Sequence, residues 1–236
     1  MPLTISGKPV KYIAVVNGGR EVTLIGSAEY DYWADRLLHD NLVPQKVNGR
    51  AEVILSAVQL KWMGISFREF SVSIRVHDRA EPSIDGIYLV SAFSTSRLLA
   101  FIENHHFRTP YCHSNIDVSV QDPWSLQLFD GRNPVIKSER HDADDVEYCD
   151  ETWEVRIFLP NGARRVTPSD KLFFATLSGA TQIVRFSATS DSLALMPSNQ
   201  HAVVQSLVDS GFTGSEWRVR SNATHARSKT YRRAVG

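Results

Sequence analysis

The sequence predicts an α+β fold in which one large antiparallel or mixed β-sheet, curved or barrel-like, carries a few peripheral helices. Three observations support this prediction. Segments that alternate between apolar and polar residues follow one another in hairpin-like runs, rather than alternating with helices as in a parallel sheet. Only three segments show helical spacing. No glycine-rich phosphate loop follows a strand, which argues against a dinucleotide-binding fold.

The strands are predicted from alternation and from β-branched residues. We expect strands over residues 11–16, 21–25, 51–61, 67–76, 87–93, 116–120, 125–129, 136–140, 153–159, 172–177, 181–186 and 216–220. Turn signals at 17–19, 130–131 and 178–179 predict strand pairs, because Asn and Gly tolerate the positive φ of tight turns. Along residues 67–76, one polar face carries Glu69, Ser71, Ser73 and Arg75.

Three helices are predicted. Residues 31–39 show helical spacing with Asp31 as a fair N-cap, and residues 94–104 form a second helix capped by Ser94, Thr95 or Ser96. The third helix covers residues 199–209. The whole chain, 1–236, is expected to be one domain.

The charges balance overall but are unevenly distributed. The chain has 26 basic and 26 acidic residues, so nothing draws it strongly to nucleic acid or to a membrane. Residues 139–154 contain eight acidic residues and one arginine, and from Arg218 to the end there are six Arg or Lys residues and no acid. The simpler interpretation is a solvated acidic loop and a basic tail over about residues 222–236. The alternative is that the two segments meet, within one chain or across a subunit contact.

The cysteines and the hydropathy indicate the cellular environment in which the protein is expected to work. Cys112 and Cys149 have no CxxC spacing, so we expect free thiols, no metal and no other cofactor. No basic-apolar leader opens the chain and no apolar run approaches a membrane span. The expectation is a reduced, cytoplasmic protein.

A run of short motifs carries a resemblance to a known family. Residues 64–69 read Gly-Ile-Ser-Phe-Arg-Glu, residues 88–90 read Tyr-Leu-Val, a helix passes through 100–103, and Thr109-Pro110 form a loop. In this order and spacing, the stretch from Trp62 to His113 resembles the central part of the acetoacetate-decarboxylase superfamily, including its uncharacterised bacterial relatives. The resemblance implies an acetoacetate-decarboxylase-like fold, and homo-oligomers are common in that family.

The catalytic apparatus of that family carries over only in part. Its glutamate falls on Glu69, whereas its nucleophilic lysine falls near Tyr111 and Cys112, where no lysine stands. The neighbouring activating lysine is absent, and the early arginine falls near Ser27. Imine formation needs an uncharged amine, so the resemblance implies this fold without the Schiff-base chemistry. Lys61 is a remote alternative amine, which we expect at the surface instead.

Candidate site residues follow from the resemblance and from residue chemistry. A carboxylate, a phenol and an imidazole near one loop suit acid/base work, and arginines and aromatic groups suit substrate binding. The candidate catalytic residues are Glu69, Tyr111 and His113; the candidate substrate-binding residues are Arg75, Arg97, Trp62, His106 and Phe93.

Several alternatives stay open at these positions. His105 and His106 equally suit a helix C-terminus, where histidine interacts well with the helix dipole. Metal binding by His105, His113 and Glu103 has no recognisable ligand spacing. Arg97 either reaches into the cavity or pairs with a carboxylate such as Glu103. Cys112 is expected to be a buried thiol.

These residues favour an enzyme. The expected activity is cofactor-independent acid/base chemistry of lyase or isomerase type (decarboxylation, dehydration or cyclisation) on a small oxo-acid or a polyketide-like substrate, as in secondary metabolism. The alternative is a protein that binds a small molecule in the same cavity without catalysis. Nucleic-acid binding through the basic tail is the weakest alternative. We expect no nucleic-acid or membrane partner, and we expect the chain to form a homo-oligomer.

Overall fold

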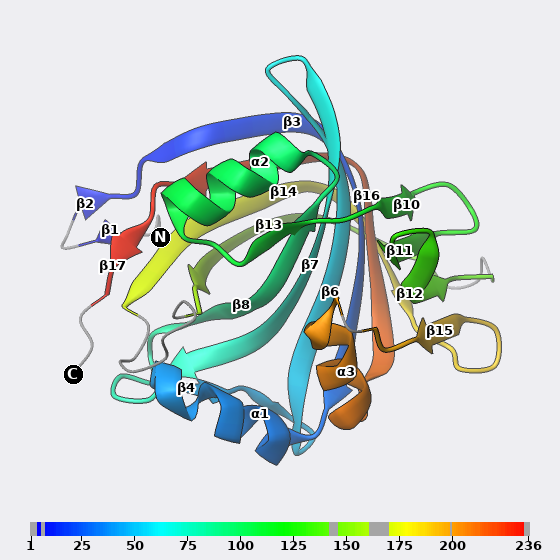
Figure 1. The fold of residues 1–236 in the computed structure, drawn as a ribbon, viewed down its shortest axis with the longest axis horizontal. Coiled ribbons are helices and arrows are strands. Elements are labelled where there is room, and N and C mark those ends of the chain that lie inside the picture. Colours follow the sequence, from blue (N-terminus) through cyan, green and yellow to red (C-terminus); the bar gives the residue numbers. More distant parts are fainter. Residues whose placement is uncertain (1–3, 6–7, 142–145, 161–169, 199, 234–236) are drawn as a thin grey trace.

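A computed structural model describes residues 4–5, 8–141, 146–160, 170–198 and 200–233, most of them in β-strands (Figure 1). The long strands are β3 (Tyr12–Ala28), β6 (Arg50–Trp62), β7 (Ile65–Asp78), β8 (Asp85–Ser94), β13 (Glu147–Phe158), β14 (Lys171–Arg185) and β16 (Thr213–Ser228). The shorter ones are β1 (Thr4–Ile5), β2 (Lys8–Pro9), β4 (Leu42–Pro44), β5 (Lys46–Val47), β9 (Tyr111–His113), β10 (Ile116–Ser119), β11 (Ser125–Asp130), β12 (Asn133–Glu139), β15 (Ser192–Leu195) and β17 (Tyr231–Arg232).

The seven long strands form a closed ring. Its order is β7-β6-β3-β16-β14-β13-β8, and β8 pairs back onto β7. All neighbours are antiparallel except β13 and β8, which run parallel and pair only through residues 157–158 and 87–88. The sheet is therefore large, mixed and strongly curved, with three short α-helices, as the sequence predicts.

Two predicted hairpins are wrong. Residues 17–19 and 178–179 lie within the continuous strands β3 and β14 instead of reversing the chain. Gly18 has φ +75° and Gly179 has φ +145°, and the pairing with β16 shifts register beside both glycines. A positive φ that could make a turn here bends a long strand around the ring.

The predicted basic tail is also wrong for most of its length. Strand β16 continues to Ser228, and β17 adds two further residues paired with β14. Strand β16 is held because Trp217, Val219 and Ala223, none of which lines the cavity, are fully buried. The C-terminal segment is thus part of the ring up to β17, and residues 234–236 lie outside the described residues.

The predicted helices are present with shifted ends. Helix α1 (Tyr30–Leu37) continues into the 3-10 turn η1 (Leu38–Asp40), and its N-cap is Glu29 rather than Asp31. Helix α2 (Arg97–Ile102) is capped by Ser96, whose hydroxyl accepts a 3.3 Å hydrogen bond from the Leu99 amide, and it continues into the π-turn η2 (Glu103–Phe107). Helix α3 is Ala202–Asp209.

A second, four-stranded sheet packs against the outer face of part of the ring. Its order is β10-β11-β12-β15. Apolar residues of this sheet, such as Leu126 and Ile136, share one core with Val22 of β3, Leu55 of β6 and Val72 of β7. Strands β3, β6 and β7 are therefore covered on their outer face, and their alternate residues face the inside of the ring.

Among the described residues, none of the helices is long and apolar enough to cross a membrane.

The short parallel contact between β8 and β13 predicts a sensitive position. A Cβ at Gly86 would lie 2.3 Å from the Arg156 carbonyl oxygen, so Gly86→Ala must push the two strands apart. We expect the variant to lose about 1–3 kcal/mol or more of unfolding free energy in urea denaturation. Gly131→Asn is the control: Gly131 has φ +62° and no atom near its Cβ position, and Asn tolerates that φ. Equal stability of the two variants would contradict the closed ring.

Candidate functional site

The ring encloses a cavity of about 620 Å³. All seven ring strands contribute to its wall, and α2, η2 and β9 close one end. The described lining contains no lysine side chain. Most of the wall is apolar, and its larger aromatic members are Trp62, Phe67, Phe107, Trp153 and Phe173.

Glu69 and Tyr111 form the polar pair at the closed end of this cavity. Glu69 lies on β7 and Tyr111 on the short strand β9, which pairs with β8, and the Tyr111 hydroxyl donates a 3.2 Å hydrogen bond to Glu69 Oε2. The remaining exposure of Glu69 is toward the cavity that it lines. No hydrogen bond to its second oxygen, Oε1, is found within the described residues, so that oxygen is available to a ligand.

Burial changes the ionisation of this pair. The pKa of Glu69 is raised to about 7. Desolvation is the main cause and the nearby Glu103 carboxylate adds to it, while the Tyr111 hydrogen bond and the charges of Arg227 and His225 partly oppose the rise. Burial, together with the charges of Glu69 and Glu103, holds the pKa of Tyr111 well above its usual range. At neutral pH the site therefore holds a carboxyl that exchanges protons readily beside a phenol that keeps its own.

Arg227 and Glu103 form an ion pair beside Glu69. Glu103 also accepts a 2.8 Å hydrogen bond from the buried Thr109 hydroxyl. The Arg227 guanidinium lies between two aromatic rings, 4.6 Å from the centroid of Phe107 and 4.4 Å from that of Phe173. The two rings fix the arginine in place, so its charge is directed at Glu103.

A second polar cluster lines the cavity on β3 and β16. Glu21 accepts hydrogen bonds from Thr23 (2.9 Å) and Ser56 (3.0 Å), and its Oε2 lies 3.3 Å from His225 Nε2 and 3.9 Å from Arg220 Nη1. Burial alone would raise the pKa of Glu21, but the contacts with His225, Arg220 and Thr23 outweigh burial and lower it to about 2. Glu21 is therefore a permanent carboxylate.

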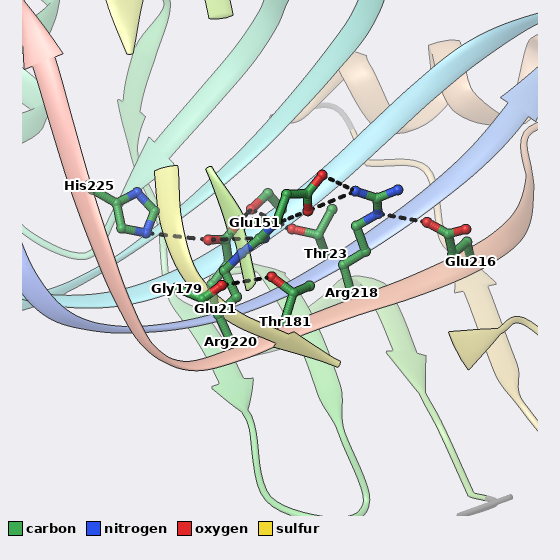
Figure 2. Close-up of polar contacts among 10 residues, drawn as sticks. Glu21, Thr23, Glu151, Gly179, Thr181, Glu216, Arg218, Arg220 and His225 are labelled. Carbon is green, nitrogen blue, oxygen red and sulfur yellow. Dashed lines mark hydrogen bonds and ion pairs between the residues drawn. The ribbon is translucent and has the colours of Figure 1, made fainter. Parts of the chain in front are cut away.

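The acidic and basic segments meet at this cluster (Figure 2). Glu151 on β13 accepts two 3.0 Å hydrogen bonds from Arg218 and one of 2.8 Å from Arg220, both on β16. Arg218 also binds Glu216 at 2.6 Å. The alternative in which the two segments meet within one chain is the one found, and β13 replaces the expected acidic loop from Glu147 onward. Residues 142–145 lie outside the described residues.

Four of the eight candidate residues line the cavity. Glu69 and Tyr111 are in contact, and Trp62 forms part of the wall. Arg75 also lines the cavity, but its Nε binds Glu52 at 2.6 Å. The predicted polar face of residues 67–76 does turn inward, since all four of its members are cavity residues.

The other four candidates lie elsewhere. His113, His106 and Arg97 are exposed, and none of them lines the cavity. Phe93 is buried in the core, where its ring packs edge-on against His201 with 4.9 Å between centroids. Helix α2 presents its Leu99 and Ile102 face to the cavity, which leaves Arg97 and the histidines on the outer side.

The neighbours of these candidates also differ from expectation. Glu103 pairs with Arg227 rather than with Arg97. His105 stacks on Phe101, 4.1 Å between centroids, and the described residues contain no group of three His, Cys, Asp or Glu side chains placed to hold a metal. Cys112 is exposed rather than buried, because β9 pairs only with β8 among the described strands.

The sequence did not single out Glu21, His225 and Arg227 as site residues. Glu21 was detectable in principle, because it precedes an alternating apolar run and shares a face with Thr23 and Ile25. His225 and Arg227 lie in a segment whose polar composition is typical of a tail. Nothing local indicates that they face a cavity.

Comparison with solved structures was made on the whole chain. An acetoacetate decarboxylase structure aligns with TM-score 0.63 and 12% identity over 92% of this chain and 88% of that one. The acetoacetate decarboxylase of Legionella pneumophila gives 0.61 and 14% over 100% and 92%. The enduracididine biosynthesis enzyme MppR gives 0.59 and 10% over 96% and 90%.

Neither a family model nor a curated protein matches the sequence. At identities of 10–14%, the structural likeness establishes the fold alone. It extends over nearly all of each chain compared. The chain therefore has the acetoacetate-decarboxylase-like fold.

Proposed function

We propose that the protein is an enzyme that moves protons on a carbonyl substrate held in the ring cavity, by acid/base chemistry and without a Schiff base. The reaction is of lyase or isomerase type: decarboxylation, dehydration or cyclisation. The observation that carries the proposal is the Glu69–Tyr111 pair, a carboxyl whose pKa is about 7 hydrogen-bonded to a phenol inside a largely apolar cavity. The enzymes that share the fold support it.

The chemistry follows from the two protonation states of Glu69. As a carboxylate, Glu69 takes a proton from the carbon next to the substrate carbonyl. The Tyr111 hydroxyl then turns its hydrogen bond to the carbonyl oxygen, where negative charge develops. The protonated Glu69 returns the proton at another carbon, or to a hydroxyl group that leaves as water. In a cyclisation the enolate carbon instead attacks a second carbonyl of the substrate, and the oxygen of that carbonyl takes the proton. In a decarboxylation CO₂ leaves first, its bonding electrons form the enolate, and protonated Glu69 then protonates the enolate carbon. A carboxyl with a pKa near the working pH does both steps well.

Two features support an imine-free reaction. The position that follows Pro110 is Tyr111, and the described cavity wall carries no lysine. Lys61 is exposed, whereas Trp62, the next residue on β6, lines the cavity. The proposal needs only the chain's own groups, and it keeps the homo-oligomeric state and the cytoplasmic location as expectations.

Glu69→Gln removes the proposed base at almost constant shape. We expect deuterium exchange next to the carbonyl of a bound ketone, read by NMR in D₂O, to fall by about 100-fold or more. Glu147→Gln, on the exposed part of β13, is the control and should leave exchange unchanged. Unchanged exchange in Glu69→Gln would contradict Glu69 as the base, and a bound ketone that shows no exchange in the natural protein would indicate a ligand-binding protein. Covalent capture of the ketone by borohydride would contradict the imine-free route.

The pH profile tests the origin of the shifted pKa. The exchange rate should rise with pH through a midpoint near 7, because the base form of Glu69 appears there. Glu103→Gln removes the carboxylate that raises this pKa and frees Arg227, which lowers it, so the midpoint should move to lower pH. A midpoint that stays in place, or moves up, would contradict the described electrostatics.

Burial of Glu69 also predicts a stability cost. Its folded-state pKa, about 7, lies above its ordinary value of 4.5, so the folded protein binds more protons between these values. Its contribution to stability is therefore present at low pH and is lost as pH rises from about 4.5 to 7. At pH 8, Glu69→Gln should be more stable than the natural protein by about 1–3 kcal/mol in urea denaturation. A less stable variant at pH 8 would count against the burial.

A further inference from the structure

Among the described residues, every arginine that lines the cavity already has a carboxylate partner. Arg75 Nε binds Glu52 at 2.6 Å, and Arg227 pairs with Glu103. Arg218 and Arg220 share Glu151 at 3.0 Å and 2.8 Å. Arg218 has a second partner in Glu216, and Arg220 has one in Glu21.

The charges of this set do not favour an anion. Four guanidinium groups and His225 face six carboxylates: Glu21, Glu52, Glu69, Glu103, Glu151 and Glu216. Whichever protonation states Glu69 and His225 adopt, the set carries no net positive charge. A carboxylate ligand would leave water without gaining a surplus cation among the described residues, and that desolvation is costly.

The unpaired N–H groups of these arginines do not change the balance, because those of Arg75 and Arg218 belong to guanidinium groups that already pair with a carboxylate and those of Arg227 and Arg220 are out of reach. Arg227 Nε and Nη2 and Arg220 Nε have no hydrogen-bond partner among the described residues. All three atoms are themselves buried, and the Arg227 guanidinium is covered by the rings of Phe107 and Phe173. A ligand in the cavity therefore cannot reach them in this arrangement.

The wall and the size of the cavity suit an apolar body. Five aromatic side chains besides Tyr111 line it, and α2 adds Leu99 and Ile102. The volume, about 620 Å³, lies within the range of about 300–1,000 Å³ that is typical of sites for larger organic ligands. Burial of apolar ligand surface against this wall supplies the binding energy that the paired arginines do not.

We propose that the substrate is an uncharged, mainly apolar carbonyl compound that carries no carboxylate. This inference rests on the proposed function. Of the two substrate classes that the sequence predicts, it favours a polyketide-like ketone over a small oxo-acid, and it therefore favours dehydration or cyclisation over decarboxylation, which needs a carboxylate. Glu69 and Tyr111 act on the carbonyl group of the substrate, and the apolar wall binds the rest of the molecule. The balanced arginines serve to neutralise the enclosed glutamates.

A matched pair of ligands tests the proposal. The probes are a nine-carbon methyl ketone and the oxo-acid of the same length whose far end is a carboxylate. Binding is measured by calorimetry, and exchange next to the carbonyl by NMR in D₂O. We expect the ketone to bind at least about tenfold more tightly than the oxo-acid at pH 8. Equal or tighter binding of the oxo-acid, or no binding of the ketone, would overturn the substrate class.

Failure of the substrate class and failure of the proposed function are separable. Glu69-dependent exchange of the oxo-acid alone would keep the function and overturn the class. Ketone binding without Glu69-dependent exchange would keep the class and overturn the function.

A change of the charge balance gives an independent readout. Glu216→Gln removes one partner of Arg218 from a residue that does not line the cavity. We expect oxo-acid affinity to rise about three- to tenfold while ketone affinity stays constant, because the set around the cavity carries one negative charge fewer. Glu147→Gln removes the same charge from an exposed position and should change neither affinity. An unchanged oxo-acid affinity in Glu216→Gln would contradict the role of the paired arginines.

Discussion

A closed ring of strands has to neutralise every charge that its interior holds, and this constraint organises the site. Buried charges are stable only when they are paired or when they lose their charge. Glu21, Glu103 and Glu151 follow the first route, each with an arginine partner on β16. Glu69 has a phenol as its hydrogen-bond partner and follows the second, since its pKa is raised to about 7. The reactive carboxyl is the one without its own cation.

Strand β16 provides the arginines that neutralise the carboxylates of the interior. Its residues Arg218, Arg220, His225 and Arg227 all face the cavity, while Trp217 and Val219 are fully buried on its other face. Its partners lie far away in the chain, at Glu21, Glu103 and Glu151. The C-terminal strand therefore closes the ring and balances its interior at the same time.

The sequence predicted the strands well, because alternation is a local property. Period-two spacing placed Glu69 and Arg75 on one face of β7, but only the family resemblance favoured the interior for that face, which is where the structure has it. Two glycine signals were misassigned, because a positive φ at Gly18 or Gly179 suits a turn and a bent strand equally well. Only ring closure decides between them.

The site could be predicted only where it is local. Glu69 and Tyr111 lie in the short motifs that resemble the acetoacetate-decarboxylase superfamily, and that resemblance implied a common cavity for them. The Arg227–Glu103 and Arg218–Glu151 pairs join residues far apart in the chain, and no spacing rule indicates such partners. His113 and Arg97 were placed by proximity in sequence, but the turn of α2 and the short reach of β9 direct them outward.

Glu69 is present in both its protonated and its ionised form near neutral pH, because it is buried beside Tyr111. Titration of the Glu69 side-chain carboxyl carbon by ¹³C NMR, assigned with the Glu69→Gln variant, tests this claim directly. The account predicts a midpoint near pH 7 for Glu69, with Glu21 remaining ionised down to about pH 2. A Glu69 midpoint near 4.5, its ordinary value, would contradict the account.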